Sequence, residues 1–340
     1  MPKNIAFFAD GTWDDPCNNT NVLQLFEATD SIDGAQVKRY DDGIGADGNP
    51  VSHLFGGAFG AGITEKVKEG YTWIESQYLP GDRIYLFGFS RGAYTARCLA
   101  GMIAVSGLPT VNKDDPKCLD MAFEAYRNTD YRSEILDELK PSYGMDDAKI
   151  HMIGVWDTVG SLGIPAIFGG VDVVQYGFLD TSLHPDVQNA VQALAIDEKR
   201  LQFQPTLWEL AQTPGQTLTQ VWYTGCHCDV GGGNRPDENG NALSNITLRW
   251  MAGHASNNGL QISAGKLPQT QLMGDAMAAI NNSLLGLYTL TPHLRNIASD
   301  ASLYISVADR CGNPYANYSP ENLHIRSGKL SATYSIVKIP

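Results

Sequence analysis

Short apolar runs separated by amphipathic stretches mark the chain up to residue 223. Each run is typical of a strand buried on both faces in a parallel sheet. The apolar runs span residues 5–9, 84–87 and 150–156, and the more polar segments 37–40 and 218–223 are further strand candidates. From Ile63 to Tyr78 apolar side chains recur at three- and four-residue steps, which predicts an amphipathic helix. This alternation predicts an α/β protein with a mainly parallel sheet and helices on both faces.

Two segments break the alternation and are interpreted as insertions. Residues 108–148 are polar with two helical patches, which predicts an insertion over the sheet. Residues 161–187 mix apolar side chains with glycine and proline, which predicts an irregular segment that lines a pocket or acts as a lid. Ordinary core packing is the alternative for this second segment. Without repeats or a long linker, residues 1–340 are expected to form a single domain.

Residues 88–92 read G-F-S-R-G between an apolar run and a helix-forming segment. A G-x-S-x-G turn between a strand and a helix is the pattern of a nucleophile elbow, which exposes a serine at the carboxyl end of a strand. An ordinary strand-to-helix turn is the alternative. The flanking strand and helix favour Ser90 as a catalytic nucleophile.

Two further candidates follow apolar runs, so the three come in the order Ser90, Asp157, His227. This is the chain order of α/β-hydrolase triads, so we expect that fold. A serine needs a base to take its proton, histidine can supply it, and an aspartate fixes the imidazole. Asp197 and Asp229 are the competing acids, and Asp157 has a second interpretation as a helix or turn cap.

An oxyanion hole needs two backbone N–H donors. The residue after the nucleophile, Arg91, is the first candidate. Gly11 or Thr12, after the first strand, is the second, with a plain Asp-Gly turn as the alternative. Asp10, next to Gly11, and Asp229, two residues after His227, are expected to support the site.

Composition and charge exclude several function classes. The chain is 43% hydrophobic and 18% charged, as in a globular protein with a substantial core. A net charge of −13 argues against binding to a nucleic-acid backbone. It also gives no attraction to anionic lipid surfaces, so a membranous substrate must be held by apolar contact.

Cysteines and glycines give no cofactor signal. The six cysteines form no C-x-x-C pair, and neighbouring residues in Cys226-His227-Cys228 point in different directions, which disfavours zinc. Residues 56–62 are rich in glycine but lack the spacing of a phosphate-binding loop, and close packing at a helix start is expected there. We therefore predict no metal and no cofactor.

Targeting signals are equally sparse. The apolar run at residues 5–9 is too short for a signal peptide. No run of about 18 or more apolar residues is present, so no transmembrane segment is predicted. The protein is expected to be cytoplasmic when made.

Together these motifs resemble the α/β-hydrolase domain family that includes the first class of type VI secretion phospholipase effectors. The resemblance runs through almost the whole chain. The motifs are F-A-D-G-T-W at residues 8–13, G-D at 81–82, G-F-S-R-G-A-Y at 88–94, G-V-W-D-T-V-G at 154–160, A-L-A-I-D-E-K-R at 193–200, H-C-D-V-G-G-G at 227–233, and L-S-N, R-W-M and Y-S-P-E-N-L from residues 243, 249 and 318.

The resemblance implies that Ser90, Asp157 and His227 are the triad. The sequence departs from the family at Gln192, where histidine is frequent, and at Cys228, where serine is common. The large carboxyl-terminal membrane-associating regions of the bigger effectors are not expected here, which bears on the phospholipid substrate more than on the chemistry. An effector of this family implies an immunity protein, a secretion-spike protein, and delivery to the target-cell periplasm.

The sequence thus predicts a serine hydrolase that cleaves lipid or phospholipid acyl esters through an acyl-enzyme. Two alternatives remain open. One is an intracellular small-ester esterase or thioesterase, and the other is a non-catalytic interaction module on the same fold.

Overall fold

The computed structural model describes residues 2–11, 19–43, 57–159, 182–209, 213–269, 272–326 and 329–338. Within these residues, eight strands form one sheet in the order β10-β7-β6-β5-β4-β3-β1-β2, and every neighbouring pair is parallel. The strands are β1 (Asn4–Ala9), β2 (Gln36–Asp41), β3 (Arg83–Phe89), β4 (Ile150–Trp156), β5 (Asn189–Ala195), β6 (Thr217–Tyr223), β7 (Ser302–Tyr304) and β10 (Ser335–Val337). A small antiparallel pair, β8 (Ile325–Arg326) and β9 (Lys329–Leu330), stands apart.

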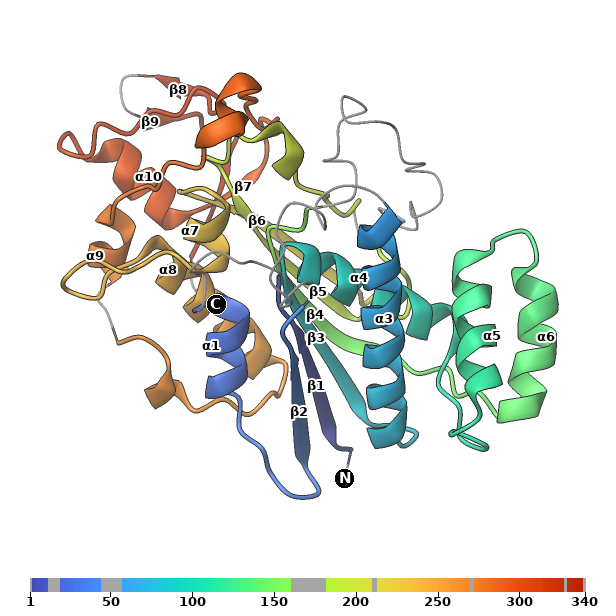
Figure 1. The fold of residues 1–340 in the computed structure, drawn as a ribbon. Helices are drawn as coiled ribbons and strands as arrows, with labels where there is room; N and C mark the ends of the chain where they lie inside the picture. The colour runs from blue at the N-terminus through green and yellow to red at the C-terminus, as the bar shows by residue number, and fades with distance from the viewer. Residues whose placement is uncertain are drawn as a thin grey trace.

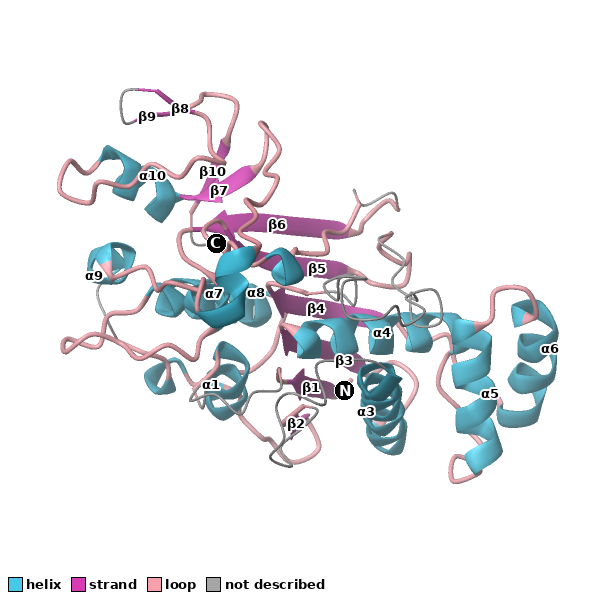
Figure 2. Cartoon of the chain, turned by 45° about the horizontal axis from the view of Figure 1, so that its top comes forward, coloured by secondary structure: helices cyan, strands magenta, loops and turns pink. Residues whose placement is uncertain are grey.

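Helices cover both faces of the sheet (Figures 1 and 2). One face carries α3 (Gly57–Gln77), α4 (Arg91–Ser106), α5 (Pro116–Arg127) and α6 (Arg132–Tyr143). The other carries α1 (Asn21–Ala28), α7 (His227–Gly231), α8 (Leu243–Asn257), α9 (Leu272–Met277) and α10 (Ile305–Gly312). Single 3₁₀ turns are η4 (Leu201–Phe203), η5 (Ala264–Lys266) and η6 (Gly286–Leu290). None of the helices in the described ranges is long and apolar enough to cross a membrane.

Alternate side chains of the buried strands belong to two different parts of the core, one on each face of the sheet. In β1, Ile5 and Phe7 pack with α3 and α4, whereas Ala6 and Phe8 pack with α1 and α8. Successive side chains of a strand point to opposite faces, so a strand covered on both sides must be apolar throughout. All of β1 is buried, as its continuous apolar run predicts. The α/β fold with a mainly parallel sheet is therefore confirmed.

The segment at residues 108–148 contains the two predicted helices, α5 and α6. They form an outer layer, because α5 packs against α4 and α6 packs against α5. Most of the other predicted insertion, residues 160–181, lies outside the described residues. Helix α3 begins at Gly57, inside the glycine-rich stretch for which a helix start was predicted.

Candidate active site

Ser90 occupies a strained turn between β3 and α4. Its backbone has φ 57° and ψ −119°, in the positive-φ region that non-glycine residues rarely adopt. Its N–H donates to the Trp156 carbonyl at 3.1 Å, which ties the turn to the end of β4. The residue is 2% exposed. The turn therefore has the backbone strain expected of a nucleophile elbow.

Two glycines make this turn possible. A Cβ atom on Gly88 would lie 2.5 Å from the Gly92 carbonyl oxygen, so strand and helix meet without room for a side chain. A Cβ atom on Gly92 would lie 2.1 Å from the Ala9 oxygen and 2.6 Å from that of Asp10. The glycine positions of the motif thus bring α4 directly onto the end of β1.

Asp157 follows β4 and is fully buried. Its backbone also has a positive φ of 44°, and its N–H donates to the Ala193 carbonyl on β5 at 2.8 Å. Its carboxylate Oδ2 lies 2.6 Å from Nδ1 of His227. The structure therefore brings together the aspartate and the histidine that the sequence singled out.

A residue that the sequence did not predict completes this cluster. The guanidinium of Arg295 binds the Asp157 carboxylate through Nη1 to Oδ1 at 2.6 Å and Nη2 to Oδ2 at 2.8 Å. Arg295 also donates to the carbonyls of Ala195 and Phe203, and its side chain is fully buried. Burial alone would raise the pKa of the Asp157 carboxyl. The charge of Arg295 and the hydrogen bonds outweigh it, so the pKa is held well below its ordinary value.

His227 begins α7 and is enclosed by aromatic rings. Phe89 lies 4.5 Å and Phe203 5.0 Å from the imidazole, measured between ring centroids. Burial lowers the pKa of His227, and the opposing charge of Asp157 does not fully restore it. The Nε2 atom is buried and forms no hydrogen bond with any part of the chain that the structure describes. A neutral imidazole that donates from Nδ1 to Asp157 leaves Nε2 as a proton acceptor.

A second acidic residue supports His227 from the backbone side. Glu198 accepts the His227 N–H at 3.2 Å and forms a two-point ion pair with Arg200, at 2.9 Å for both contacts. Burial opposes ionisation of Glu198, but Arg200 outweighs it and lowers the pKa to about 2. Glu198 is therefore a carboxylate that fixes the start of α7.

The predicted oxyanion-hole residues lie at two neighbouring strand ends. Arg91 is the first residue of α4, where helix N–H groups point outward along the axis. The Gly11 N–H donates to the Asp10 carboxylate at 2.8 Å in this structure. Thr12 lies outside the described residues. Burial lowers the pKa of the Arg91 guanidinium to about 10.

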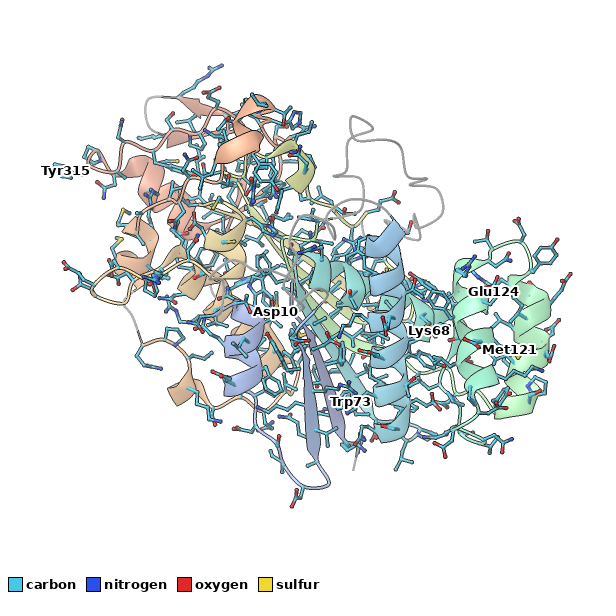
Figure 3. All side chains as sticks on the ribbon, in the orientation of Figure 1. Asp10, Lys68, Trp73, Met121, Glu124 and Tyr315 are labelled. Atoms are coloured by element: carbon cyan, nitrogen blue, oxygen red, sulfur yellow. The ribbon has the colours of Figure 1, made fainter. Side chains whose placement is uncertain are left out.

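Asp10 and the competing acids hold loops around the site. Asp10, at the end of β1 (Figure 3), accepts hydrogen bonds from Thr20 and from Tyr40, and burial raises its pKa. Asp197 accepts from Gly225 at 2.7 Å and from Tyr318 at 2.9 Å. Asp229 accepts the N–H groups of Cys226 and Asn281, both at 3.0 Å. These contacts are structural supports for the strand-end loops.

The described residues offer no cluster of metal ligands. No group of three or more His, Cys, Asp or Glu side chains is placed there to hold a metal ion. Cys226 precedes α7 as its N-terminal cap, and burial raises the pKa of its thiol.

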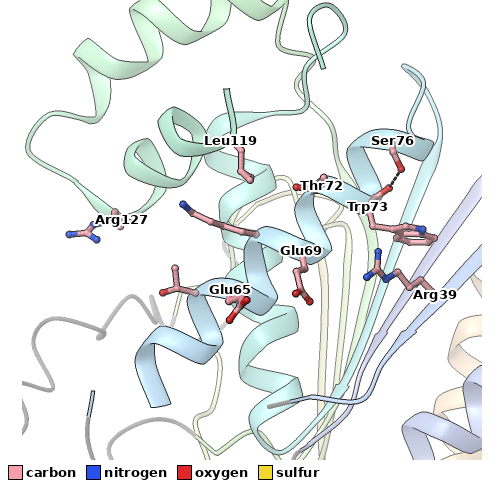
Figure 4. Close-up of a pocket in the computed structure, with 10 residues that line it drawn as sticks. Arg39, Glu65, Glu69, Thr72, Trp73, Ser76, Leu119 and Arg127 are labelled. Carbon is pink, nitrogen blue, oxygen red and sulfur yellow. Dashed lines mark hydrogen bonds between the residues drawn. The ribbon is translucent and has the colours of Figure 1, made fainter. Parts of the chain in front are cut away.

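An open pocket of about 850 Å³ lies on the outer side of α3, away from the strand ends (Figure 4). Arg39, Lys68 and Arg127 line it together with Glu65 and Glu69. None of the predicted site residues belongs to its lining, so this pocket is separate from the candidate active site.

Comparison with known proteins finds similarity to a yeast protein in sequence and to a bacterial protein in structure. Uncharacterized protein YEL023C of Saccharomyces cerevisiae is 32% identical over 188 residues, which are 48% of this chain and 27% of that protein. A crystal structure of an uncharacterized protein from Pseudomonas aeruginosa aligns with a TM-score of 0.47 and 16% identity, over 81% of this chain and 48% of that one. The chain thus spans about a quarter of the length of the yeast relative.

The family comparison covers most of the chain. The model of the type VI secretion (T6SS) phospholipase effector Tle1-like catalytic domain matches residues 3–254. This range includes Ser90, Asp157 and His227, whereas Arg295 lies beyond it. The chain therefore belongs to the family of T6SS phospholipase effector Tle1-like catalytic domains.

Proposed function

We propose that this protein hydrolyses the acyl ester bonds of phospholipids through an acyl-serine intermediate. The observation that carries the proposal is the buried 2.6 Å contact between Asp157 and His227 beside the strained turn at Ser90. Membership of a phospholipase effector family supports the substrate class. The three side chains follow β3, β4 and β6, whose carboxyl ends share one edge of the sheet.

In the proposed reaction, Ser90 Oγ attacks the ester carbonyl carbon while His227 Nε2 takes its proton. The tetrahedral intermediate collapses, and the glycerol oxygen leaves with that proton as a lysophospholipid. Water then attacks the acyl-serine by the same route and releases the fatty acid. Nε2 of His227 has no hydrogen-bond partner among the described residues, Ser90 included. Such contacts often form only when substrate is bound.

Asp157 and Arg295 are proposed to position the base. The carboxylate accepts a hydrogen bond from the Nδ1–H group, which fixes the tautomer that leaves Nε2 able to accept a proton. Arg295 holds the carboxylate at both oxygens and keeps it ionised. When His227 becomes a cation during turnover, the charge of Asp157 stabilises it, whereas the charges of Arg200 and Glu198 oppose each other.

The oxyanion formed during attack needs donors near Ser90. We assign the Arg91 N–H as one donor because it begins the helix that follows the nucleophile. The second donor is assigned to the loop after β1, from Gly11 or Thr12. Use of Gly11 requires its N–H to leave the Asp10 carboxylate that it contacts here.

The biological setting is proposed from the family alone. A T6SS effector is delivered into a target cell, where a periplasmic site of action exposes it to phospholipid. An immunity protein and a secretion-spike protein are the partners that this setting requires. A domain of this kind acting on small esters, or without catalysis, would need none of these partners.

Phosphatidylethanolamine vesicles provide the test. The protein is expected to release free fatty acid and lysophospholipid, and Ser90→Ala is expected to lose at least about 10³-fold in rate. Ser76→Ala, an exposed serine on α3, is the matched control and should retain full activity. Hydrolysis of p-nitrophenyl butyrate without phospholipid cleavage would instead indicate the small-ester esterase. Absence of both, with no fluorophosphonate labelling of Ser90, would indicate the non-catalytic module.

A further inference from the structure

Residues 276–294 form an uncharged stretch in an acidic protein. They include no Asp, Glu, Lys or Arg, although the chain carries a net charge of −13. The stretch presents large apolar side chains to solvent: Leu285 is 65% exposed, Leu290 76% and Leu294 39%. Contiguous exposed apolar surface is typical of an interaction site, and these three exposed leucines lie within ten residues of one another.

This leucine segment, residues 285–294, lies over the candidate active site. Tyr288 packs edge-on against Phe203 at 6.1 Å, and Phe203 contacts the imidazole of His227. The His293 N–H donates to the Lys199 carbonyl at 2.8 Å. Figure 1 shows the η6 turn, in orange at the top, beyond the carboxyl ends of the strands.

The segment is also fixed to the site at its end. Arg295 follows Leu294 directly and forms the ion pair with Asp157. The exposed leucines are therefore held at a set position relative to Ser90 and His227.

We propose that Leu285, Leu290 and Leu294 form a contact surface for a phospholipid layer, into which their side chains insert. The proposal rests on the proposed function. Phospholipid substrates are packed in a layer, so the protein must contact that layer near its active site to reach them. The acidic chain gains no attraction from anionic headgroups, so apolar insertion must supply the affinity. An uncharged segment crosses the headgroup region without the cost of burying charge.

Binding to phosphatidylcholine vesicles tests this surface without any turnover. Ser90→Ala serves as the starting protein, so that the lipid stays intact. Adding Leu290→Ser or Leu285→Ser is expected to weaken vesicle binding roughly tenfold each, since each removes a leucine side chain from the buried contact. The double variant should lose about a hundredfold, and binding should persist at high salt.

Leu79→Ser is the matched control. Leu79 is 63% exposed, in the turn between α3 and β3 at the opposite edge of the sheet, and its replacement should leave vesicle binding unchanged. Unfolding midpoints of all variants should agree, because these side chains are exposed.

Three results would overturn the proposal. They are full binding by the double variant, an equal loss with Leu79→Ser, or a dimer in light scattering that Leu290→Ser dissociates, which would assign the surface to a second copy. A different result would contradict the proposed function alone. If vesicle binding depends on the leucines but the unaltered protein hydrolyses no ester, the contact surface is supported and the hydrolase function is refuted.

Discussion

Arg295 binds both carboxylate oxygens of Asp157, at 2.6 and 2.8 Å, although 138 positions separate the two residues. Both side chains are fully buried. The aspartate that orients His227 is thus itself oriented by a cation. In the proposed mechanism Arg295 is a positioning residue, since it acts on His227 only through Asp157.

Replacing Arg295 is expected to destabilise the protein strongly. Arg295→Met leaves a buried carboxylate without its charge partner, and loss of one member of such a pair typically costs about 3–5 kcal/mol. Urea unfolding measures this loss. Arg127→Met, at an exposed ion pair with Glu124, should change the free energy of unfolding by less than about 1 kcal/mol.

The variant Arg295→Lys tests whether Arg295 positions Asp157 for catalysis or only stabilises the fold. Lysine keeps the charge but lacks the planar fork that donates two parallel hydrogen bonds to a carboxylate. We expect the pH profile of kcat/KM to change shape, because Asp157 then holds the imidazole less firmly. An unchanged profile in a folded variant would show that Arg295 serves stability alone.

In the proposed mechanism, the protonation state of His227 sets the pH dependence of activity. Burial holds its pKa below the ordinary 6.5, and only the neutral ring can take the Ser90 proton. Activity should therefore be lost as pH falls, with the acid inflection of kcat/KM below pH 6.5. His254→Gln, which removes another half-buried histidine, should leave this inflection in place. An inflection above 6.5 would contradict the assignment of His227 as the base.

The contact between Gly92 and β1 can be tested by adding one methyl group. Gly92→Ala places a Cβ atom 2.1 Å from the Ala9 oxygen and should cost at least about 1–3 kcal/mol, with loss of activity as the turn at Ser90 moves. Gly265→Ala has no atom within 4 Å of the added carbon and should stay within about 0.5 kcal/mol of the unaltered protein. Equal thermal shifts for both variants would refute this packing argument.

Titration of Glu75 is expected to make the free energy of unfolding depend on pH. Burial raises its pKa from 4.5 to about 7, so between these values the folded protein binds protons that the unfolded chain releases. The contribution of Glu75 to stability therefore falls as pH rises through this window. Glu75→Gln should flatten that part of the profile, whereas Glu138→Gln, at an exposed ion pair, should not. Chemical denaturation across the pH range measures both.

Strong local patterns explain which parts of the fold could be predicted. The runs that became β1, β3 and β4 are continuous and apolar, and they matched the structure closely. Strand β5 was not predicted: its fully buried Gln192 interrupts a short run, and the Gln192 amide donates to a distant carbonyl, that of Thr206. Helix α8 was also missed, because its polar side chains Asn245 and Thr247 are buried and obscure the helical period.

In the candidate site, too, some residues could be predicted from the sequence and others could not. Ser90, Asp157 and His227 each follow a predicted strand, so the parallel sheet alone places them at one edge. Arg295 follows no strand and carries no motif, and only the tertiary fold brings it to Asp157. Glu198 lies in a recognised motif, but its contact with the His227 backbone depends on the path of two loops.

The distance in sequence between Asp157 and Arg295 sets an order for synthesis. A ribosome completes Ser90, Asp157 and His227 well before Arg295 emerges. Until then, closing the core around Asp157 would bury a carboxylate with no cation beside it, which is costly. The nascent chain can therefore complete the region around Asp157 only after Arg295 has been made, so translation of a segment far beyond His227 determines when the candidate site exists.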